Sequence, residues 1–597
     1  MENQKVIVFG VDGLIPNLVY KFAEEGNLPN IKEMMNGGAT SELLPFISTW
    51  GDVNWVSFLT GQSPGCSWKG QSEPGTNEGN VLGLTNSLGK RGALVHFPKT
   101  VSTEGTNHFS FAPFQGAPPF ELASPRVFST DMNKWPLKET KESLGWPPTS
   151  AISHHEKNNL SSIEINNGHY LFNLQLNNGE KLGVSIQLLD EQCIRLHVNE
   201  VTEVDIEAET WSEWLKVQLD NRVEGIVRFK LAKYDRNKGE IDIIQSQINR
   251  TSGLSNDSKL EEYLLANCGP FISTWTVKAS PDELYHETSF EEGEYQAMWL
   301  ANAALKLVNH KDIDYFATVY RLNDETQHTS LSQYDPSSPF YSEELSYIYE
   351  ENMKKSYEVL DRAIGKILSE KMDDTTLILA SDHGGVPNHY FCDIYLRLEE
   401  CGLCELDDKG MPVLSKSKAY LKNNRGGLEV FVNLKGREET GIVAPEDYEM
   451  VQSDIFHAIV TWVNNVRGKS ENVSALTLKK QDAPIIGYWG PEMGDVIFTY
   501  NQGYVWGTNK KDVIGPVSEP GANHGPQITS ARTSHSSNLG IFISHGKYLK
   551  KGYQYNADKF GPYLMNDAGK TIFDLLASTE SPSIDGRFMS QLFTSER

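Results

Sequence analysis

Long hydrophobic runs and cysteine are both scarce in this sequence. A helix needs about 18 consecutive apolar residues to cross a bilayer, and no such stretch occurs, so we expect no membrane span. Only 6 of the 597 residues are Cys, and they lack the dense, regular spacing of a disulfide framework. Cys401 and Cys404 form a lone CxxC pair without the second pair that a zinc ribbon requires.

Positive charge is also in deficit. The chain has 54 Lys plus Arg against 79 Asp plus Glu, which gives a net charge of −25. A surface of this sign repels nucleic-acid polymers and anionic membranes, so we expect neither as a partner. It does not exclude a small phosphorylated ligand, because a bound metal ion or a local Arg reverses the field inside a site.

The N-terminal residues MENQKVIVFGVDG predict a buried strand rather than a signal peptide. The apolar run is short and a carboxylate follows it at once. We therefore expect a cytoplasmic protein. A chain of 597 residues is too long for a single compact core, so two or more folding units are expected.

Four short apolar runs without alternation indicate strands buried on both faces, as in an α/β sheet covered by helices. They lie at 5–10, 314–320, 375–380 and 539–544. Apolar residues at helical spacing predict helices over 15–35 and 341–370. Polar residues follow the first three runs, and ligands of such sheets bind at the carboxyl ends of strands.

The segment 126–289 differs, because it contains strand-like runs and a hairpin turn signal at 177–180. We predict an inserted β-rich domain there. It divides a core into two parts, at 1–125 and 290–597, and the second part contains a cap-like segment at about 392–480. The predicted fold class is α/β, with a central, mostly parallel sheet flanked by helices.

Three Asp and three His accompany the ends of the predicted strands. Asp12 follows the first run, Asp324 and His328 the second, Asp382 and His383 the third, and His535 precedes the fourth. Singly, such residues are commonly helix caps, turn residues or surface pairs. Together, these N and O donors are a plausible complement for two divalent ions of the zinc type.

Five segments of this sequence together resemble those of a known family. They are the Asp12-Gly13 strand end, Asn54-Trp55 ahead of Thr60-Gly61, Asp324 to His328, Ser381-Asp382-His383-Gly384, and 433–443. The combination resembles the alkaline phosphatase superfamily, and within it the type I phosphodiesterase / nucleotide pyrophosphatase family. The similarity covers roughly residues 1–70 and 290–555 and is weak or absent across the β insertion.

The resemblance implies an alkaline-phosphatase-like sandwich and a two-metal site beside a Thr or Ser nucleophile. Zinc suits the ligands, and manganese or iron also fit. His524 is the alternative to His535, which we prefer because it directly precedes a buried run, as in the family. Carried over residue by residue, Asp324, His328 and His535 hold one ion, and Asp12, Asp382 and His383 hold the other.

The expected nucleophile loop, PFISTWGDVNWVSFLTG at 45–61, departs from the family's spacing. Counting back from Asn54 lands on Gly51, which has no hydroxyl. If the loop carries two extra residues, Thr49 is the nucleophile and a metal ligand, with Ser48 as the alternative. If it does not, the nucleophile is lost. We favour Thr49 because the metal ligands persist, and Asn54 matches the residue whose amide hydrogen-bonds a phosphoryl oxygen.

The expected function is a metal-dependent phosphodiesterase or nucleotide pyrophosphatase that hydrolyses a small organophosphate through a covalent Thr intermediate. One alternative is a phosphomonoesterase of the same superfamily, and another is a degenerate member that binds a ligand without turnover. A sulfatase is not favoured, because the chain lacks a Cys-x-Pro-x-Arg motif. Trp211, Trp214 and Trp275 are able to stack on a substrate ring, although core positions are expected for them.

Overall fold

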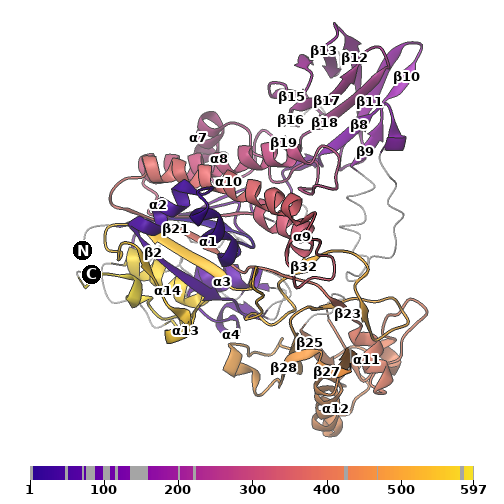
Figure 1. The fold of residues 1–597 in the computed structure, drawn as a ribbon, viewed down its shortest axis with the longest axis vertical. Helices are drawn as coiled ribbons and strands as arrows, with labels where there is room; N and C mark the ends of the chain where they lie inside the picture. The colour runs from indigo at the N-terminus through magenta and orange to yellow at the C-terminus, as the bar shows by residue number, and fades with distance from the viewer. Residues whose placement is uncertain are drawn as a thin grey trace.

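A nine-stranded sheet forms the centre of the molecule in this computed structural model (Figure 1). The structure describes residues 4–47, 52–69, 73–74, 88–98, 108–114, 118–134, 159–198, 202–219, 223–422, 428–466, 468–577 and 584–595. The middle of the sheet is parallel, because β1 (Lys5–Val11) pairs with β20 (Tyr315–Tyr320) on one side and with β21 (Thr375–Ser381) on the other.

The edges of this sheet are mixed in direction. β33 (Gly540–His545) runs antiparallel to β21, so the residues that precede β33 meet the carboxyl ends of β1, β20 and β21. The order is β34-β2-β33-β21-β1-β20-β5-β6, with β35 beside β2. The remaining strands are β2 (Ala39–Leu44), β5 (Gly92–Val95), β6 (His108–Phe111), β34 (Tyr553–Gln554) and β35 (Tyr563–Leu564).

Helices cover both faces of the sheet, and this explains why its strands are apolar without alternation. Ile7 and Phe9 of β1 belong to one core, and Val6 and Val8 belong to a second core. The first core includes residues of α1 (Pro16–Glu24), α2 (Pro29–Gly37), α8 (Glu287–His310) and α10 (Ser346–Glu370), and the second includes residues of α3 (Asp52–Thr60) and α14 (Met565–Leu576).

The predicted α/β class, with a mostly parallel sheet flanked by helices, is therefore confirmed. The helix expected over 15–35 is instead two helices, α1 and α2. Pro29 begins α2, and since proline has no N–H to donate, it opens a helix readily but disrupts a continuous one. The helix expected over 341–370 begins at Ser346.

A β-rich lobe projects from one side of the core (Figure 1). Its sheets have the orders β10-β11-β12-β13-β14, β15-β16-β19-β7 and β17-β18-β8-β9. It has a hydrophobic core of its own. The strands are β7 (Glu121–Ala123), β8 (Arg126–Ser129), β9 (Leu160–Ser162), β10 (Glu164–Asn166), β11 (His169–Gln175), β12 (Lys181–Leu188), β13 (Cys193–Val198), β14 (Thr202–Glu207), β15 (Leu215–Gln218), β16 (Glu224–Val227), β17 (Phe229–Asp235), β18 (Glu240–Gln245) and β19 (Ile248–Arg250).

A second unit, which we call the cap, lies at the opposite end of the molecule (Figure 1). It too has its own core. The predicted domain boundaries stay predictions, although the cap's strands extend past residue 480. Its elements include α11 (Ile394–Glu400), α12 (Tyr448–Val460), β23 (Tyr390–Cys392), β24 (Ala419–Tyr420), β25 (Glu429–Val432), β28 (Ser474–Lys479), β29 (Val496–Tyr500), β30 (Tyr504–Trp506) and β31 (Ile514–Pro516). Within the described part of the chain, no helix is both long and apolar enough to cross a membrane.

Candidate metal centre

Three aspartates meet at one edge of the central sheet. Asp12 directly follows β1 and Asp382 directly follows β21, while Asp324 lies in the first turn of α9 (Leu322–Tyr334), just beyond β20. Because these strands are parallel neighbours, their carboxyl ends lie side by side. The sequence-predicted carboxylates are thus brought together by the strand order alone.

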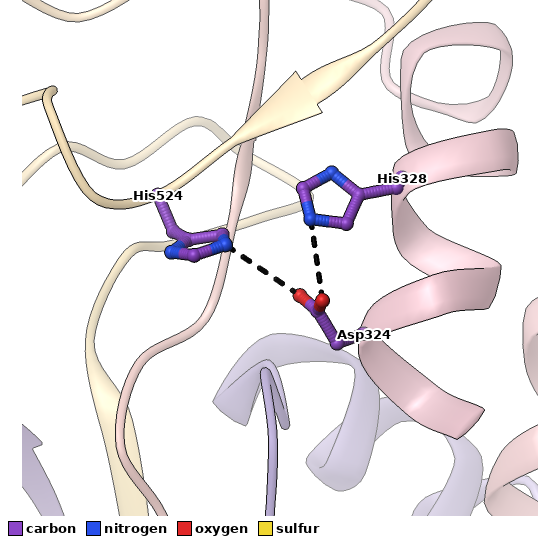
Figure 2. Close-up of side chains that lie close together, drawn as sticks. All are labelled: Asp324, His328 and His524. Carbon is purple, nitrogen blue, oxygen red and sulfur yellow. Dashed lines mark ion pairs between the residues drawn. The ribbon is translucent and has the colours of Figure 1, made fainter. Parts of the chain in front are cut away.

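Asp324, His328 and His524 form the first group of potential metal ligands (Figure 2). The Oδ2 atom of Asp324 lies 3.2 Å from Nε2 of His328, and Oδ1 lies 3.8 Å from Nε2 of His524. Nδ1 of His328 lies 2.8 Å from the Ala522 carbonyl oxygen. Since a carbonyl only accepts, Nδ1 carries the proton and Nε2 presents its lone pair, an arrangement typical of metal-binding histidines.

Asp12, Asp324 and His383 form a second group, so Asp324 is common to both. Nε2 of His383 lies 3.2 Å from Oδ1 of Asp12 and 3.3 Å from Oδ2 of Asp382. Its Nδ1 lies 2.9 Å from the Gly384 carbonyl oxygen, which fixes the same tautomer as in His328. The ligand atoms within each group lie within 4.8 Å of one another.

A short strand pair explains how His524 reaches this edge. β32 (Ala522–Asn523) pairs with β22 (Val386–Pro387), with Asn523 opposite Val386. The segment returning from the cap is thereby fixed beside the Asp382-His383 turn. The rings of His383 and His524 stack with centroids 3.5 Å apart and an interplanar angle of 8°.

The electrostatics of the cluster fit a cation. Asp382 is fully buried, and burial raises the pKa of its carboxyl well above its usual range. Burial opposes protonation of His383, but the carboxylates of Asp382 and Asp12 outweigh it and raise its pKa to about 10. Similarly, Asp324 outweighs burial and raises the pKa of His328 to about 9. These acidic groups need positive charge between them, and their N and O atoms are the donors that zinc-type ions prefer.

His535 does not join this cluster. The hydroxyls of Thr533 and Ser536 donate to Oδ2 of Asp335, at 2.5 and 2.7 Å, and tie their turn to the end of α9. The ring of His535 packs edge-on against Tyr334, with centroids 5.4 Å apart, beside a cavity lined by α1. His535 thus lies outside both groups of potential ligands and His524 lies in one of them, a placement that favours the alternative, His524, over the preferred His535.

The predicted nucleophile candidates, Ser48 and Thr49, lie outside the described residues, so their roles stay predictions. The residues before them are held by Asn54, whose Oδ1 accepts from the Phe46 N–H at 2.7 Å and whose Nδ2 donates to the Phe46 carbonyl at 3.4 Å. Asn54 therefore contacts the loop backbone, and its predicted contact with a phosphoryl oxygen is untested.

Gly10 brings α3, which carries Asn54, directly onto the sheet. A Cβ atom at Gly10 would lie 2.6 Å from the Thr318 carbonyl oxygen and 2.7 Å from the ring of Trp55. The missing side chain therefore makes room for Trp55 of α3. A small cavity connects this helix with the histidines, and it is lined by Pro45, Phe46, Asn54, His383, His524, Gly525, Thr529 and Asn538.

Sequence reasoning missed Tyr488, which holds the same loop from the other side. Its buried phenol donates to the carbonyl oxygen of Ile47, the last described residue before the candidate nucleophiles. Gly487, at φ +84°, lets the chain pass the ring of Phe46. Tyr488 lies beyond the predicted cap segment and in no periodic pattern, so it could not be found from the sequence alone.

These features form a candidate metal site of clustered carboxylates and imidazoles, beside the loop in which the nucleophile is predicted. The family described as type I phosphodiesterase / nucleotide pyrophosphatase matches residues 6–68 and 240–527. These segments amount to more than half of the chain, so the chain belongs to this family of metal-dependent phosphoester hydrolases in the alkaline phosphatase superfamily. The match includes His524 and ends before His535.

Three solved structures are among those that align with this chain, all at low sequence identity. Human ectonucleotide pyrophosphatase / phosphodiesterase 5 is 12% identical, with a TM-score of 0.44 over 99% of this chain and 100% of that chain. Phosphonoacetate hydrolase from Sinorhizobium meliloti 1021 is 12% identical, with a TM-score of 0.45 over 96% of each chain. The alkaline phosphatase PafA is 13% identical, with a TM-score of 0.48 over 100% of each chain. No curated protein matches the sequence.

Proposed function

We propose that the protein hydrolyses a phosphodiester or pyrophosphate bond of a small organophosphate at a two-metal centre. Asp324, His328 and His524 would hold one ion, and Asp12, Asp382 and His383 would hold the other. Thr49, or alternatively Ser48, would complete the second set and act as nucleophile. The observation that carries this proposal is that Asp324 belongs to both ligand groups, which places two sites next to each other, as two-metal phosphoesterases require.

Divalent ions bound here would neutralise charge on the phosphoryl group and lower the pKa of the attacking hydroxyl. The chain's own residues supply position. Asn54 and Tyr488 hold Phe46 and Ile47, directly before the nucleophile candidates. The backbone carbonyls of Ala522 and Gly384 orient His328 and His383. The Thr49 oxygen would bond to phosphorus as the ester or anhydride oxygen leaves, and water would then release the phosphoryl group from Thr49.

The nucleophile assignment is tested with Thr49→Ala and Ser48→Ala proteins. We expect Thr49→Ala to lose phosphodiesterase turnover by several orders of magnitude while it retains its metal, and Ser48→Ala to retain most of the turnover. Metal content measured by mass spectrometry separates loss of the nucleophile from loss of the ions. Full turnover by a metal-loaded Thr49→Ala protein would sink the assignment.

Reaction type and metal are tested on the wild-type protein. We expect bis-p-nitrophenyl phosphate to be hydrolysed with a higher kcat/KM than p-nitrophenyl phosphate, and the reverse order would indicate a phosphomonoesterase. Reconstitution with zinc, manganese or iron should identify the ion that supports turnover, with zinc as our expectation. Absence of both bound metal and hydrolysis would indicate a ligand-binding member without turnover.

A further inference from the structure

A cation, Arg321, lies at the start of α9, the helix that carries Asp324 and His328. The residue is the N-cap of the helix and directly precedes it, with φ −118° and ψ −12°. It stands three residues before Asp324 and seven before His328, and its guanidinium pairs with Glu325, the residue that follows Asp324. Its position in the chain is therefore about one helical turn from Asp324 and about two turns from His328.

Two aromatic rings lie beside the Arg321 guanidinium. Its Cζ atom lies 4.6 Å from the centroid of Phe114, which comes just after β6, and 5.8 Å from that of Trp275. Trp275 is itself fixed, because its Nε1 donates to Oε2 of Glu325 at 2.8 Å. Contacts of this kind orient a guanidinium and leave its N–H edge for polar partners.

The described residues engage the N–H groups of Arg321 only at long distances. Nη2 lies 3.5 Å from the Ser273 carbonyl oxygen, and Nη1 lies 3.5 Å from Oε1 of Glu325. By contrast, Arg437 of the cap makes two short bonds to Asp495, at 2.7 and 2.9 Å. The side chain of Arg321 is also 23% exposed. Its side chain is thus accessible, and among the described residues it has no close bidentate partner of the kind that a structural arginine has.

We infer that Arg321 binds a second anionic group of the substrate, a carboxylate or a further phosphate, on the part of the molecule attached to the reacting phosphorus. This inference rests on the proposed function, since it assumes that phosphorus reacts beside Asp324. It narrows the substrate class to organophosphates with two anionic groups. Phe114 and Trp275 act as positioning residues that keep the guanidinium edge directed at that group.

The test compares two p-nitrophenyl phosphodiesters that differ in the arm retained on phosphorus, which is 2-carboxyethyl in one and propyl in the other. A third substrate, with a 3-carboxypropyl arm, tests how far from phosphorus the carboxylate can lie. We expect Arg321→Gln to lower kcat/KM for the carboxylate substrates by about 10- to 100-fold, because a charge-assisted hydrogen bond is lost. The propyl substrate should change less than about twofold, since it makes no such bond.

Two variants serve as controls. Arg321→Lys keeps the charge but not the fork of donors, so it should recover part of the preference for the carboxylate arm. Arg362→Gln removes an exposed arginine of α10 that pairs with Glu294, and it should leave both substrates unaffected. Equal losses on all substrates in Arg321→Gln would overturn the inference and indicate a structural role, as would a wild-type protein without preference for a carboxylate arm.

A binding measurement separates this inference from the proposed function. Calorimetry on the metal-loaded protein compares methylenediphosphonate, which has two phosphonate groups, with methylphosphonate, which has one. We expect Arg321→Gln to weaken the first about tenfold or more and to leave the second unchanged. If the wild-type protein hydrolyses no diester, the proposed function fails while this comparison still decides the role of Arg321. Equal effects on both ligands would overturn it.

Discussion

The sheet edge and the cap contribute to the candidate site in different ways. The sheet edge provides Asp12 and Asp382 directly from the ends of neighbouring strands, and Asp324 from the first turn of α9 just beyond β20, so their meeting follows largely from strand order. The cap region provides His524 and Tyr488, which reach the site only because distant segments pair or pack against it. The aspartate ligands of such a site therefore follow from local features of the chain. The last histidine ligand and the alignment of the nucleophile loop depend instead on tertiary contacts.

The largest effect is expected from substitution of the two candidate histidines, which tests whether the cap segment supplies a metal ligand. We expect His524→Ala to lower kcat/KM by more than about 100-fold and to release about one metal ion per chain, because a ligand delivered by the cap segment is lost. His535→Ala is the matched variant, and it should retain its metal and at least half of the activity. Metal analysis and phosphodiester turnover on both proteins provide the measurement. Loss of metal from His535→Ala alone would restore the original preference.

The histidine result shows what sequence patterns carry. Asp12 and Asp382 follow buried runs directly, and the i, i+4 spacing of Asp324 and His328 places them on one helical face, so these positions were predictable. His535 precedes a buried run just as convincingly. Its turn is instead held by Asp335, whose bonds to Thr533 and Ser536 form only in the folded chain. The position of a residue next to a strand can be recognised from the local sequence, but the direction in which its loop runs cannot.

The same limit applies to the fold. The four buried runs and the α/β class could be predicted, because burial on both faces leaves a clear apolar pattern. The pairing of β32 with β22 could not, because strands of two residues carry no periodicity. The division of 15–35 into α1 and α2 was available from Pro29, whose missing N–H disfavours a continuous helix.

A buried glutamate, Glu292, lies where the β lobe meets the core, and its ionisation should make the stability of this junction depend on pH. Glu292 of α8 is fully buried and accepts from the Thr276 N–H at 2.8 Å, and burial raises the pKa of its carboxyl to about 7. The folded state therefore holds a proton that the unfolded state releases, and the free energy of unfolding falls as pH rises from about 4.5 to 7.

The expected decrease from this one group is of the order of 2–3 kcal/mol. The side chain of Glu292→Gln does not ionise, so the free energy of unfolding of this variant should depend less on pH. Relative to the wild type, its free energy of unfolding should therefore increase between pH 5 and 8. Thermal unfolding of both proteins across this range measures the difference. A constant difference in Tm would show that burial of this carboxyl does not control the junction.

The smallest expected effect concerns Tyr488, which lies between the cap strands β28 and β29, packs in the second core of the sheet and contacts the nucleophile loop. Tyr488→Phe keeps the ring in its buried site and removes only the bond to the Ile47 carbonyl. If the cap aligns this loop, kcat should fall by about 10-fold, since small displacements of reacting groups slow chemistry strongly. KM and metal content should stay near their wild-type values, because no proposed ligand changes. Trp489→Phe, at the neighbouring and partly exposed position, is the control and should leave kcat unchanged. A Tyr488→Phe protein with wild-type kcat would show that Asn54 alone holds the loop, and the site would then depend on the cap only for His524.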